Sequence, residues 1–450
     1  MSYILVVNPS LLAETGMPIA GAFVATALTA AICTMIMALV SNLPLALAPG
    51  MSLNSFIIYT VCLGKGFLWQ EGLAVVLMAG LLHVVIMGTR LRKSLINAVP
   101  LYLKLAMGVG MGLFIAYIGL KNTGALFFTS LPGQYNLTAS GAIISNGQIL
   151  PSISSSLRAS HVLAFVGLGI MFVLMAFERK TGESYAALPV GILAVTFLGI
   201  PFNITDISGT PIFNLSSIGE IRQVFMACLG DPGLLSLINS PNKLTTALLV
   251  ALILVVTNVL DSIGTIIGIG QASESSLFEQ PGQGRDPQNA DSETKLDRAF
   301  VCNSVSGPIA AIMGTTTTTT YIESITGIAA GGRTGLTGMV VAIFFILCLP
   351  LANIFTIIPA TATAPALIVA GSYMIMLVRR IDWQDIQQCL PAFMTILFIP
   401  LTFSAMHGVV AGIITHVIIK IAMGKIREVH PVLYVLTLMF ILDVAAESFK

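Results

Sequence analysis

The chain has 450 residues, of which 56% are hydrophobic and only 9% are charged, and its formal net charge is +1. A soluble domain carries about 25% charged residues, so this composition excludes a water-soluble protein and indicates a chain surrounded mainly by lipid. The small net charge gives no support for a nucleic-acid partner. The six cysteines stand singly, without the spacing of a disulfide framework or a metal site.

Apolar runs long enough to cross a bilayer recur along the whole chain, since a spanning helix needs about 20 mostly apolar residues. Two further segments, 44–64 and 314–332, are apolar but interrupted, and the first dozen residues resemble the end of another span. The total of about fourteen elements predicts that residues 1–450 form one all-α polytopic membrane transport domain. The uninterrupted candidates are 19–41, 72–89, 99–120, 161–178, 184–201, 244–270, 296–313, 334–352, 359–378, 391–422 and 431–446.

The order of these elements indicates two inverted repeats. Each set of spans contains one interrupted segment, third from its start, and broken segments at matching positions are typical of inverted-repeat transporters. Residues 1–201 are predicted to form the first repeat and residues 244–450 the second, joined by an external connection at 202–243. The most polar connection, 271–295, falls within the second repeat.

Basic residues predict the orientation of the chain. They recur in alternate connections, for example at 90–93, 179–180 and 379–380. Because cytoplasmic loops carry the excess of lysine and arginine, both termini are predicted to be cytoplasmic. The membrane is expected to be the plasma membrane, which is the inner membrane in a bacterium. Lys420, Lys425 and Arg427 are an exception, since this scheme places them outside.

The first interruption reads "SNLPLALAPGMSLNSF", residues 41–56. Pro49 removes a backbone donor and favours extended geometry before it, while Gly50 allows an unusual turn. Ser52 or Asn54 can then cap a helix that continues beyond the break. The segment is therefore predicted to be a half-helix preceded by a short extended stretch.

The second interruption reads "GTTTTTTYIESITGIAAGG", residues 314–332. Consecutive β-branched residues, Thr319 and Thr320 among them, favour extended backbone, and their hydroxyls can satisfy backbone groups that lack helical partners. A helix is predicted to restart near Tyr321, with Glu323 in its first turn. Irregular backbone at membrane depth survives only beside protein or a watery cavity, so both half-helices are expected to direct their N-terminal ends at one pocket.

Two acidic residues in apolar surroundings are the main candidates for function. A carboxylate at mid-membrane costs about 2.5–3.5 kcal/mol on insertion scales, so Glu323 and Asp261 are functional candidates by default. Asn258, Asp261, Ser262 and Thr265 recur at helical spacing and predict one polar face. The alternatives are a helix cap for Glu323 and an interhelical hydrogen-bond seam for the polar face.

No motif in the chain indicates chemistry on a covalent bond. There is no Ser-His-Asp pattern, HExxH motif or cysteine pair, so the protein is predicted not to be an enzyme and to need no cofactor. His83 and His416 lie on apolar stretches, where packing or capping is a commoner role than ligand binding.

Several stretches resemble a known family: "LALAPGMSLNSF", "LDSIGT", "GTTTTTTYIESITGIAAGGRTGLT", "PATATAPALIVAG" and "REVHPVLYVL". Together with "VVNPSLL" near the start, they resemble the adenine/guanine/hypoxanthine permeases, the AzgA-like branch related to the nucleobase–ascorbate transporters, over nearly the whole chain. The resemblance implies fourteen segments in two inverted sets of seven. It also implies a core domain that moves against a gate domain, and purine uptake driven by a proton gradient.

The resemblance also implies a pocket between the third and tenth segments, facing the eighth. The family's motif asparagine corresponds to Asn54, its eighth-segment acid to Asp261 and its tenth-segment glutamate to Glu323. Thr265 and the backbone around Ile322 should border the same pocket.

The chain departs from the family pattern in a few places. Ser52 and Ser55 replace small residues, residues 260–262 read Leu-Asp-Ser instead of Phe-Asp-Thr, and Asn303 replaces an expected aspartate. These changes leave the preferred purine open. The family normally reaches "MSYILVVNP" midway through its first helix, so the first segment is expected to be truncated.

The predicted function is therefore proton symport of purine nucleobases by alternating access. Glu323 is expected to hold the N–H edge of the base while Asp261 exchanges the coupling proton, although the reverse assignment and a shared proton stay open. The alternatives are an anion transporter or exchanger on the same scaffold and, with less support, an ion channel. The oligomeric state also stays open, a homodimer included.

Overall fold

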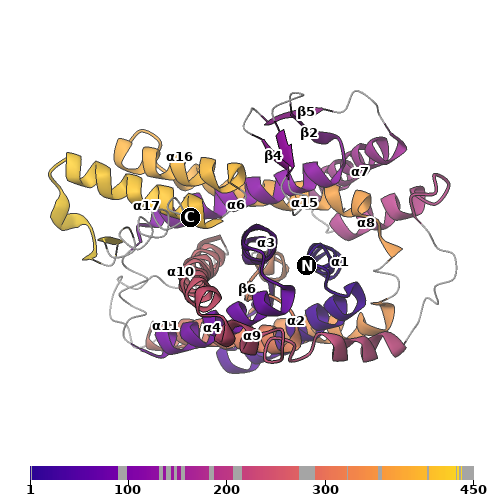
Figure 1. Cartoon of the computed structure of the whole chain (residues 1–450), viewed down its shortest axis with the longest axis horizontal. Helices are drawn as coiled ribbons and strands as arrows, with labels where there is room; N and C mark the ends of the chain where they lie inside the picture. Colours follow the sequence, from indigo (N-terminus) through magenta and orange to yellow (C-terminus); the bar gives the residue numbers. More distant parts are fainter. Residues whose placement is uncertain are drawn as a thin grey trace. The chain divides into compact units, whose positions relative to one another are not determined.

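The computed structural model consists of two compact units that are described separately (Figure 1). The larger unit contains Met1–Phe114, Pro211–Thr356 and Met374–Lys450, and the smaller contains Ile115–Thr210 and Ile357–Tyr373. Ile322, most of the connection 271–295 and the end of the predicted span 431–446 lie outside the described residues. The structure describes residues 1, 3–89, 99–130, 135–137, 143–145, 149–153, 158–181, 187–205, 215–272, 289–321, 323–352, 357–402, 405–431, 433–434 and 437.

The chain is mostly helical, as its composition predicts. Within the described residues, five helices are long and apolar enough to cross a membrane, and seven shorter helices are also apolar. The longer helices of the larger unit are α1 (Ile4–Ala13), α2 (Ile19–Ser41), α4 (Trp69–Gly88), α10 (Pro241–Ala272), α11 (Asn289–Met313), α13 (Gly335–Leu347), α16 (Ile386–Leu401) and α17 (Ala405–Ala422). Helix α6 (Leu101–Asn122) begins in this unit and ends in the smaller one.

Shorter elements of the larger unit interrupt these helices. Helix α3 (Met51–Ser55) continues as a π-helix over Phe56–Gly64, and β1 (Leu47–Pro49) precedes it. Strand β6 (Thr318–Thr320) precedes the short helix α12 (Ser324–Ala329). Among the described residues, the remaining elements of this unit are α9 (Leu234–Asn239) and four 3₁₀ segments at Leu215–Gln223, Leu349–Leu351, Met376–Arg380 and Ile426–Glu428.

Small residues allow the long helices of the larger unit to approach closely. A Cβ atom at Gly335 of α13 would lie 2.1 Å from the carbonyl oxygen of Ala38 in α2, and one at Gly80 of α4 would lie 2.7 Å from Pro308 of α11. Asn42 ends α2 in the left-handed conformation and accepts a hydrogen bond from the Gly335 N–H at 2.9 Å. Glycine contacts of this kind are typical of helix packing in membranes.

The predicted span 391–422 is wrong as a single element. The structure divides it into α16 and α17, joined by a short connection. Gly408 approaches Ile399, and farther along Lys420 bonds Gln387 at 3.0 Å, so the two helices run antiparallel. Pro400 and the link after Leu401 end the first helix before it can span the whole run.

This reversal also removes the exception in the basic-residue pattern. Lys420 and Arg427 line the same pocket as Arg380, so these basic residues lie at one end of the helix pair. The orientation scheme placed Lys420, Lys425 and Arg427 on the opposite side only because it counted one span where there are two helices.

The smaller unit contains helices and two strand pairs. Its helices are α7 (Ala159–Thr181), α8 (Ala187–Leu198) and α15 (Ala360–Ile375). Strand β2 (Leu126–Ser130) pairs antiparallel with β5 (Ile149–Ile153), and β3 (Tyr135–Leu137) with β4 (Ile143–Ser145). These strands lie between the predicted spans 99–120 and 161–178, and the search for apolar runs of membrane-spanning length does not predict them. Short runs such as "LFFTS" carry the aromatic and β-branched residues that strands favour.

Candidate functional site

The two predicted interruptions pair with each other. Strands β1 and β6 are antiparallel, with Leu47 opposite Thr320 and Pro49 opposite Thr318. The pairing extends past both strands, since the Gly50 N–H donates to the Thr317 carbonyl at 2.9 Å. Each strand leads into a half-helix, α3 and α12, so the N-terminal ends of both half-helices lie next to one strand pair. Such ends carry unpaired N–H groups and partial positive charge.

Local sequence explains why the backbone is extended here. Proline fits a strand position where no ladder N–H is needed, and Pro49 is the last residue of β1. A Cβ atom on Gly50 would lie 3.0 Å from the Thr319 methyl group, so glycine allows the two chains to approach. Thr319 and Thr320 lie in β6, and both are buried. All four residues predicted to break the half-helices therefore lie in or beside the strand pair.

The threonine hydroxyls do not act as the sequence suggested. We expected them to satisfy backbone groups, but the ladder itself does this. The hydroxyls of Thr317 and Thr320 are buried and have no hydrogen-bond partner among the described residues. Thr316 instead donates to the side-chain oxygen of Asn54 at 3.0 Å. The strand pair therefore leaves unpaired polar atoms inside the larger unit.

The second half-helix begins later than predicted. Helix α12 starts at Ser324, so Glu323 directly precedes the helix and does not lie in its first turn. Two hydrogen bonds to the first interruption keep Tyr321 alongside the strand pair. Its N–H donates to the Ala46 carbonyl at 3.0 Å, and its hydroxyl donates to the Pro49 carbonyl at 2.6 Å. Pairing with the first interruption thus delays the helix start by about one turn.

Asn54 lies inside α3, where it is fully buried, and does not cap the helix. Its amide nitrogen donates to the side-chain oxygen of Asn8, in α1. The Asn8 amide in turn donates to Thr26 at 2.7 Å and to Thr315 at 3.0 Å. Asn54 therefore belongs to a hydrogen-bonded chain that joins α1, α2 and the start of the threonine run.

The sequence analysis missed Asn8 and Tyr3. Tyr3 lies just before α1, is buried, and donates its hydroxyl to the Glu323 carboxylate at 2.7 Å. Asn8 was quoted only as part of "VVNPSLL". A polar amide within an apolar membrane segment could have identified Asn8 as a candidate, but nothing in the sequence pairs Tyr3 with a residue 320 positions away.

The structure brings both predicted acids to the same strand. The Asp261 carboxylate, on α10, hydrogen-bonds the side chain of Thr319 in β6. The Tyr321 phenol, at the end of β6, interacts electrostatically with both Asp261 and Glu323. Thr265 donates to the Asp261 backbone carbonyl at 2.9 Å, one turn earlier in its own helix. The candidate niche is therefore defined by Asp261 and Glu323 beside β6 and by the buried Asn54 amide, which bonds Thr316 earlier in the same threonine run. Carboxylates accept hydrogen bonds, and an amide both accepts and donates them.

The polar face of α10 divides into two groups. Asn258 hydrogen-bonds His83 of α4 at 3.1 Å, and Ser262 accepts from Asn303 of α11 at 2.6 Å. Asn258 and Ser262 therefore belong to an interhelical hydrogen-bond seam, which was the alternative role predicted for this face of the helix. Asp261 instead approaches Thr319 in β6. His83 thus has a polar partner as well as a packing position. Its Nε2 and the Asn303 Oδ1 have no partner among the described residues.

Within the described part of the chain, no group of three or more histidine, cysteine, aspartate or glutamate side chains lies close enough to hold a metal ion. The six cysteines are free thiols.

Comparison with known proteins extends over nearly the whole chain. The family model Xan_ur_permease, described as a permease family, matches residues 1–411. Guanine/hypoxanthine permease PbuO of Bacillus subtilis is 34% identical over 451 residues, covering 98% of this chain and 94% of the relative. Adenine permease AdeP of Escherichia coli is 31% identical over 444 residues, covering 99% and 89%.

Among solved structures, the transmembrane domain of the bicarbonate transporter BicA from a cyanobacterium is similar in fold. Its TM-score is 0.59 at 18% sequence identity, covering 90% of this chain and 94% of that domain. At this level of identity the likeness concerns the fold alone.

Proposed function

Because the chain belongs to this permease family, whose members are transporters and not enzymes, we propose that it takes up purine nucleobases by proton symport. The relatives are named as permeases for adenine or for guanine and hypoxanthine, and these three bases are the proposed substrates. Alternating access, in which one site faces each side of the membrane in turn, is the proposed mode of transport.

The observation that carries the proposal is that Asp261 and Glu323 both lie near the end of β6, where the Tyr321 phenol interacts electrostatically with each carboxylate. A purine is flat and neutral, with N–H donors along one edge and ring acceptors along another. We assign the donor edge to Glu323, whose carboxylate can accept hydrogen bonds, and a ring acceptor to the amide of Asn54. Thr265 and Ile322 are proposed to border the base.

We assign the coupling proton to Asp261. Its carboxylate lies on the continuous helix α10, whereas Glu323 lies at the start of α12, next to the strand pair. The partial positive charge of a helix N-terminus interacts favourably with a carboxylate, so Glu323 is assigned to the base and Asp261 to the coupling proton. One proton moving with a potential of 100 mV brings about 2.3 kcal/mol, enough for roughly 40- to 50-fold accumulation of the base.

An anion transporter is the main alternative, because one protein with a similar fold is a bicarbonate transporter. Two carboxylates beside the same niche would repel an anionic substrate. Repulsion between like charges about 4 Å apart costs about 1 kcal/mol in bulk water and several kcal/mol where water is excluded. The charge of the niche therefore favours a neutral base.

Uptake by cells that lack their own purine permeases tests the proposal. Labelled adenine, guanine, hypoxanthine, uracil and bicarbonate are compared, with and without a protonophore. Purine uptake that the protonophore abolishes is the expected result, with at least tenfold loss in both Glu323→Gln and Asp261→Asn. Glu14→Gln is the matched control, since Glu14 accepts from Tyr59 at an exposed position.

The two acids can be separated by exchange across the membrane. We expect Asp261→Asn to retain exchange of internal for external purine while losing accumulation, because exchange needs binding but no net proton movement. Glu323→Gln should lose both. Full accumulation by both variants would refute the site, and a preference for uracil or bicarbonate would refute the substrate class.

A further inference from the structure

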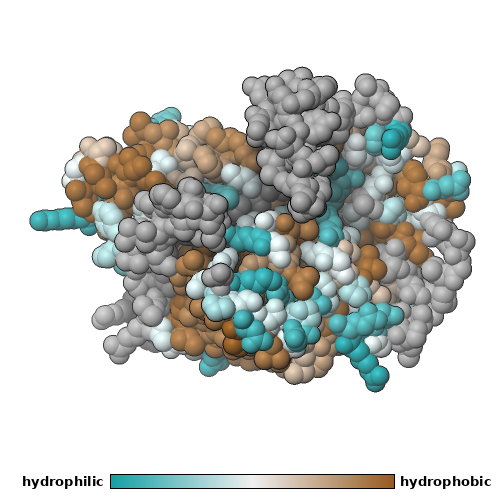
Figure 2. Space-filling view, in the orientation of Figure 1, coloured by the Kyte–Doolittle hydropathy of each residue, from teal (hydrophilic) through white to brown (hydrophobic). Residues whose placement is uncertain are grey.

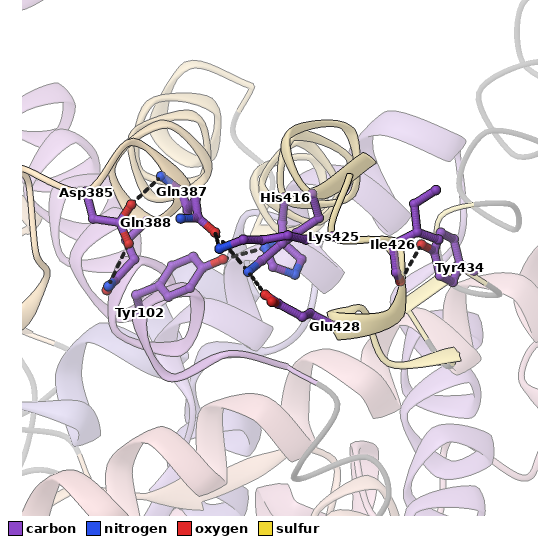
Figure 3. Close-up of polar contacts among 10 residues, drawn as sticks. Tyr102, Asp385, Gln387, Gln388, His416, Lys425, Ile426, Glu428 and Tyr434 are labelled. Atoms are coloured by element: carbon purple, nitrogen blue, oxygen red, sulfur yellow. Dashed lines mark hydrogen bonds and ion pairs between the residues drawn. The ribbon is translucent and has the colours of Figure 1, made fainter. Parts of the chain in front are cut away.

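A cavity within the larger unit shares no lining residue with the proposed transport niche. It has a volume of about 570 Å³ and is formed where the start of α6 meets the ends of α16 and α17. Its lining includes Tyr102, Asp385, Gln387, Lys420 and Arg427. Figure 3 shows that Asp385, Gln387 and His416 project from the helix pair toward the segment that carries Lys425 and Glu428.

Two ammonium groups converge on one neutral oxygen in this cavity. Lys420 Nζ lies 3.0 Å from the Gln387 side-chain oxygen, and Lys425 Nζ lies 3.5 Å from the same atom. The Glu428 carboxylate lies 2.6 Å from Lys420, and both Glu428 and Asp385 interact electrostatically with the two lysines. Like charges held this close favour a bound anion, since an amide oxygen supplies only part of a negative charge.

The second carboxylate of the cavity has another role. Asp385 caps α16 by accepting from the Gln387 N–H at 3.0 Å, and it also accepts from the Gln388 side chain at 3.3 Å. The backbone bond from Gln387 is the main reason why the pKa of Asp385 lies below its usual value. Asp385 also interacts electrostatically with Lys420 and Lys425, so it caps the helix and offsets part of their charge.

The charges of the described residues around the cavity do not cancel. Arg380, Lys420, Lys425 and Arg427 face only two carboxylates, those of Asp385 and Glu428. Guanidinium and ammonium groups together are well suited to a phosphate, which accepts several hydrogen bonds at once.

The surroundings indicate that the anion belongs to a lipid. Ile418 and Ile426 are more than half exposed, at 59% and 52%, and Leu390 and Phe393 are also exposed on the helix pair. Figure 2 shows this hydrophobic surface over α16 and α17. An apolar surface of this kind is suited to contact with acyl chains, and a basic cavity next to it is suited to the headgroup of the same lipid.

We propose that this cavity binds the phosphate group of an anionic phospholipid. Lys425 and Arg427 are the main contacts, because Lys420 already bonds Glu428. The acyl chains lie along the exposed residues of α16 and α17. This site is independent of the purine niche, and nothing in the proposal depends on the transported substrate.

Thermal unfolding of the purified full chain in detergent tests the site. Phosphatidylglycerol, phosphatidylcholine and sodium phosphate are titrated separately, and the concentration that gives half of the maximal stabilisation is measured. Only phosphatidylglycerol is expected to stabilise the parent protein at low concentration. The double variant Lys425→Gln/Arg427→Gln should need about 25-fold more of it, from about 1 kcal/mol for each basic side chain near an anionic surface.

Two further variants keep the test decisive. Arg158→Gln/Lys180→Gln removes the same charge from exposed positions elsewhere and should behave as the parent does. Glu428→Gln removes the competing carboxylate and should lower the required phosphatidylglycerol concentration, a gain that a folding defect would not produce. Equal stabilisation of the parent and the Lys425→Gln/Arg427→Gln variant would overturn the site. Equal effects of phosphatidylglycerol and sodium phosphate would overturn the lipid as its source.

Discussion

Substitution of Asn8 by alanine tests whether α1 positions the proposed purine-binding amide. Asn8 is fully buried and makes three side-chain hydrogen bonds: to Thr26 of α2, to Thr315 just after α11, and from Asn54 of α3. Asn8→Ala removes all three and leaves the Asn54 amide nitrogen without its acceptor. Asn8 acts here as a positioning residue, because its effect on the base passes through Asn54.

Two estimates of the cost agree. Interhelical hydrogen bonds in membranes average about 0.6 kcal/mol, so the two that join helices, with a similar value for the bond to Thr315, contribute about 2 kcal/mol. A buried donor left without a partner costs about 1–3 kcal/mol on its own. When the network is intact in the state that binds the base, a loss of about 2 kcal/mol in the free energy of base binding raises KM for purines about 25-fold.

The assay is the initial rate of purine uptake against concentration, together with thermal unfolding of the purified protein. Thr26→Val is the matched control, because it removes one acceptor of the Asn8 amide and leaves the bond from Asn54 intact. We expect it to raise KM less than threefold. A parental KM in Asn8→Ala, despite a lower unfolding temperature, would show that the network only stabilises the fold and would refute the positioning role.

Three further outcomes follow from the contacts. Gly335→Ala should strongly reduce the yield of folded protein, because the added Cβ would lie 2.1 Å from a backbone oxygen of α2. The control Gly88→Ala, whose Cβ would have nothing within 4 Å, should be neutral in the same expression and unfolding assay. Tyr3→Phe removes a hydrogen bond to a carboxylate and should raise purine KM about tenfold, while Tyr59→Phe, at an exposed tyrosine–glutamate pair, should change it less than twofold. Because folding lowers the pKa of Asp385, this carboxylate stabilises the folded protein at pH values above its ordinary pKa of 3.8, and the stabilisation is lost as the pH falls through its pKa in the folded protein. Asp385→Asn should therefore flatten the acid limb of a plot of unfolding temperature against pH.

The half-helix breaks could be predicted from sequence because their causes are local. Pro49 lacks a donor, Gly50 lacks a side chain, and a run of β-branched threonines resists helix formation. The pairing between the two breaks depends on segments more than 260 residues apart, which no local pattern specifies. For that reason the start of α12 was placed too early, and the threonine hydroxyls were given a role that the ladder fills.

The residues of α1 show a second limit of sequence reasoning. Asp261 and Glu323 were found because a carboxylate is costly in lipid. Tyr3 and Asn8 carry no charge, and their part in the site depends on where α1 packs. The helix pair α16 and α17 shows the same limit at a larger scale, since a hydropathy pattern alone does not locate a reversal inside a long apolar run.

The strand pair explains how a polar niche can exist inside so apolar a chain. In lipid every backbone group needs a partner, and a broken helix would leave several N–H and C=O groups unpaired at each break. Pairing β1 with β6 satisfies the two breaks with each other, so side chains are not needed for that purpose. The hydroxyls of Thr317 and Thr320 are consequently left without partners among the described residues, and the Asp261 and Glu323 carboxylates approach the same strand. In the proposed function, these unpaired hydroxyls and the two acids supply hydrogen-bonding groups to a flat purine base.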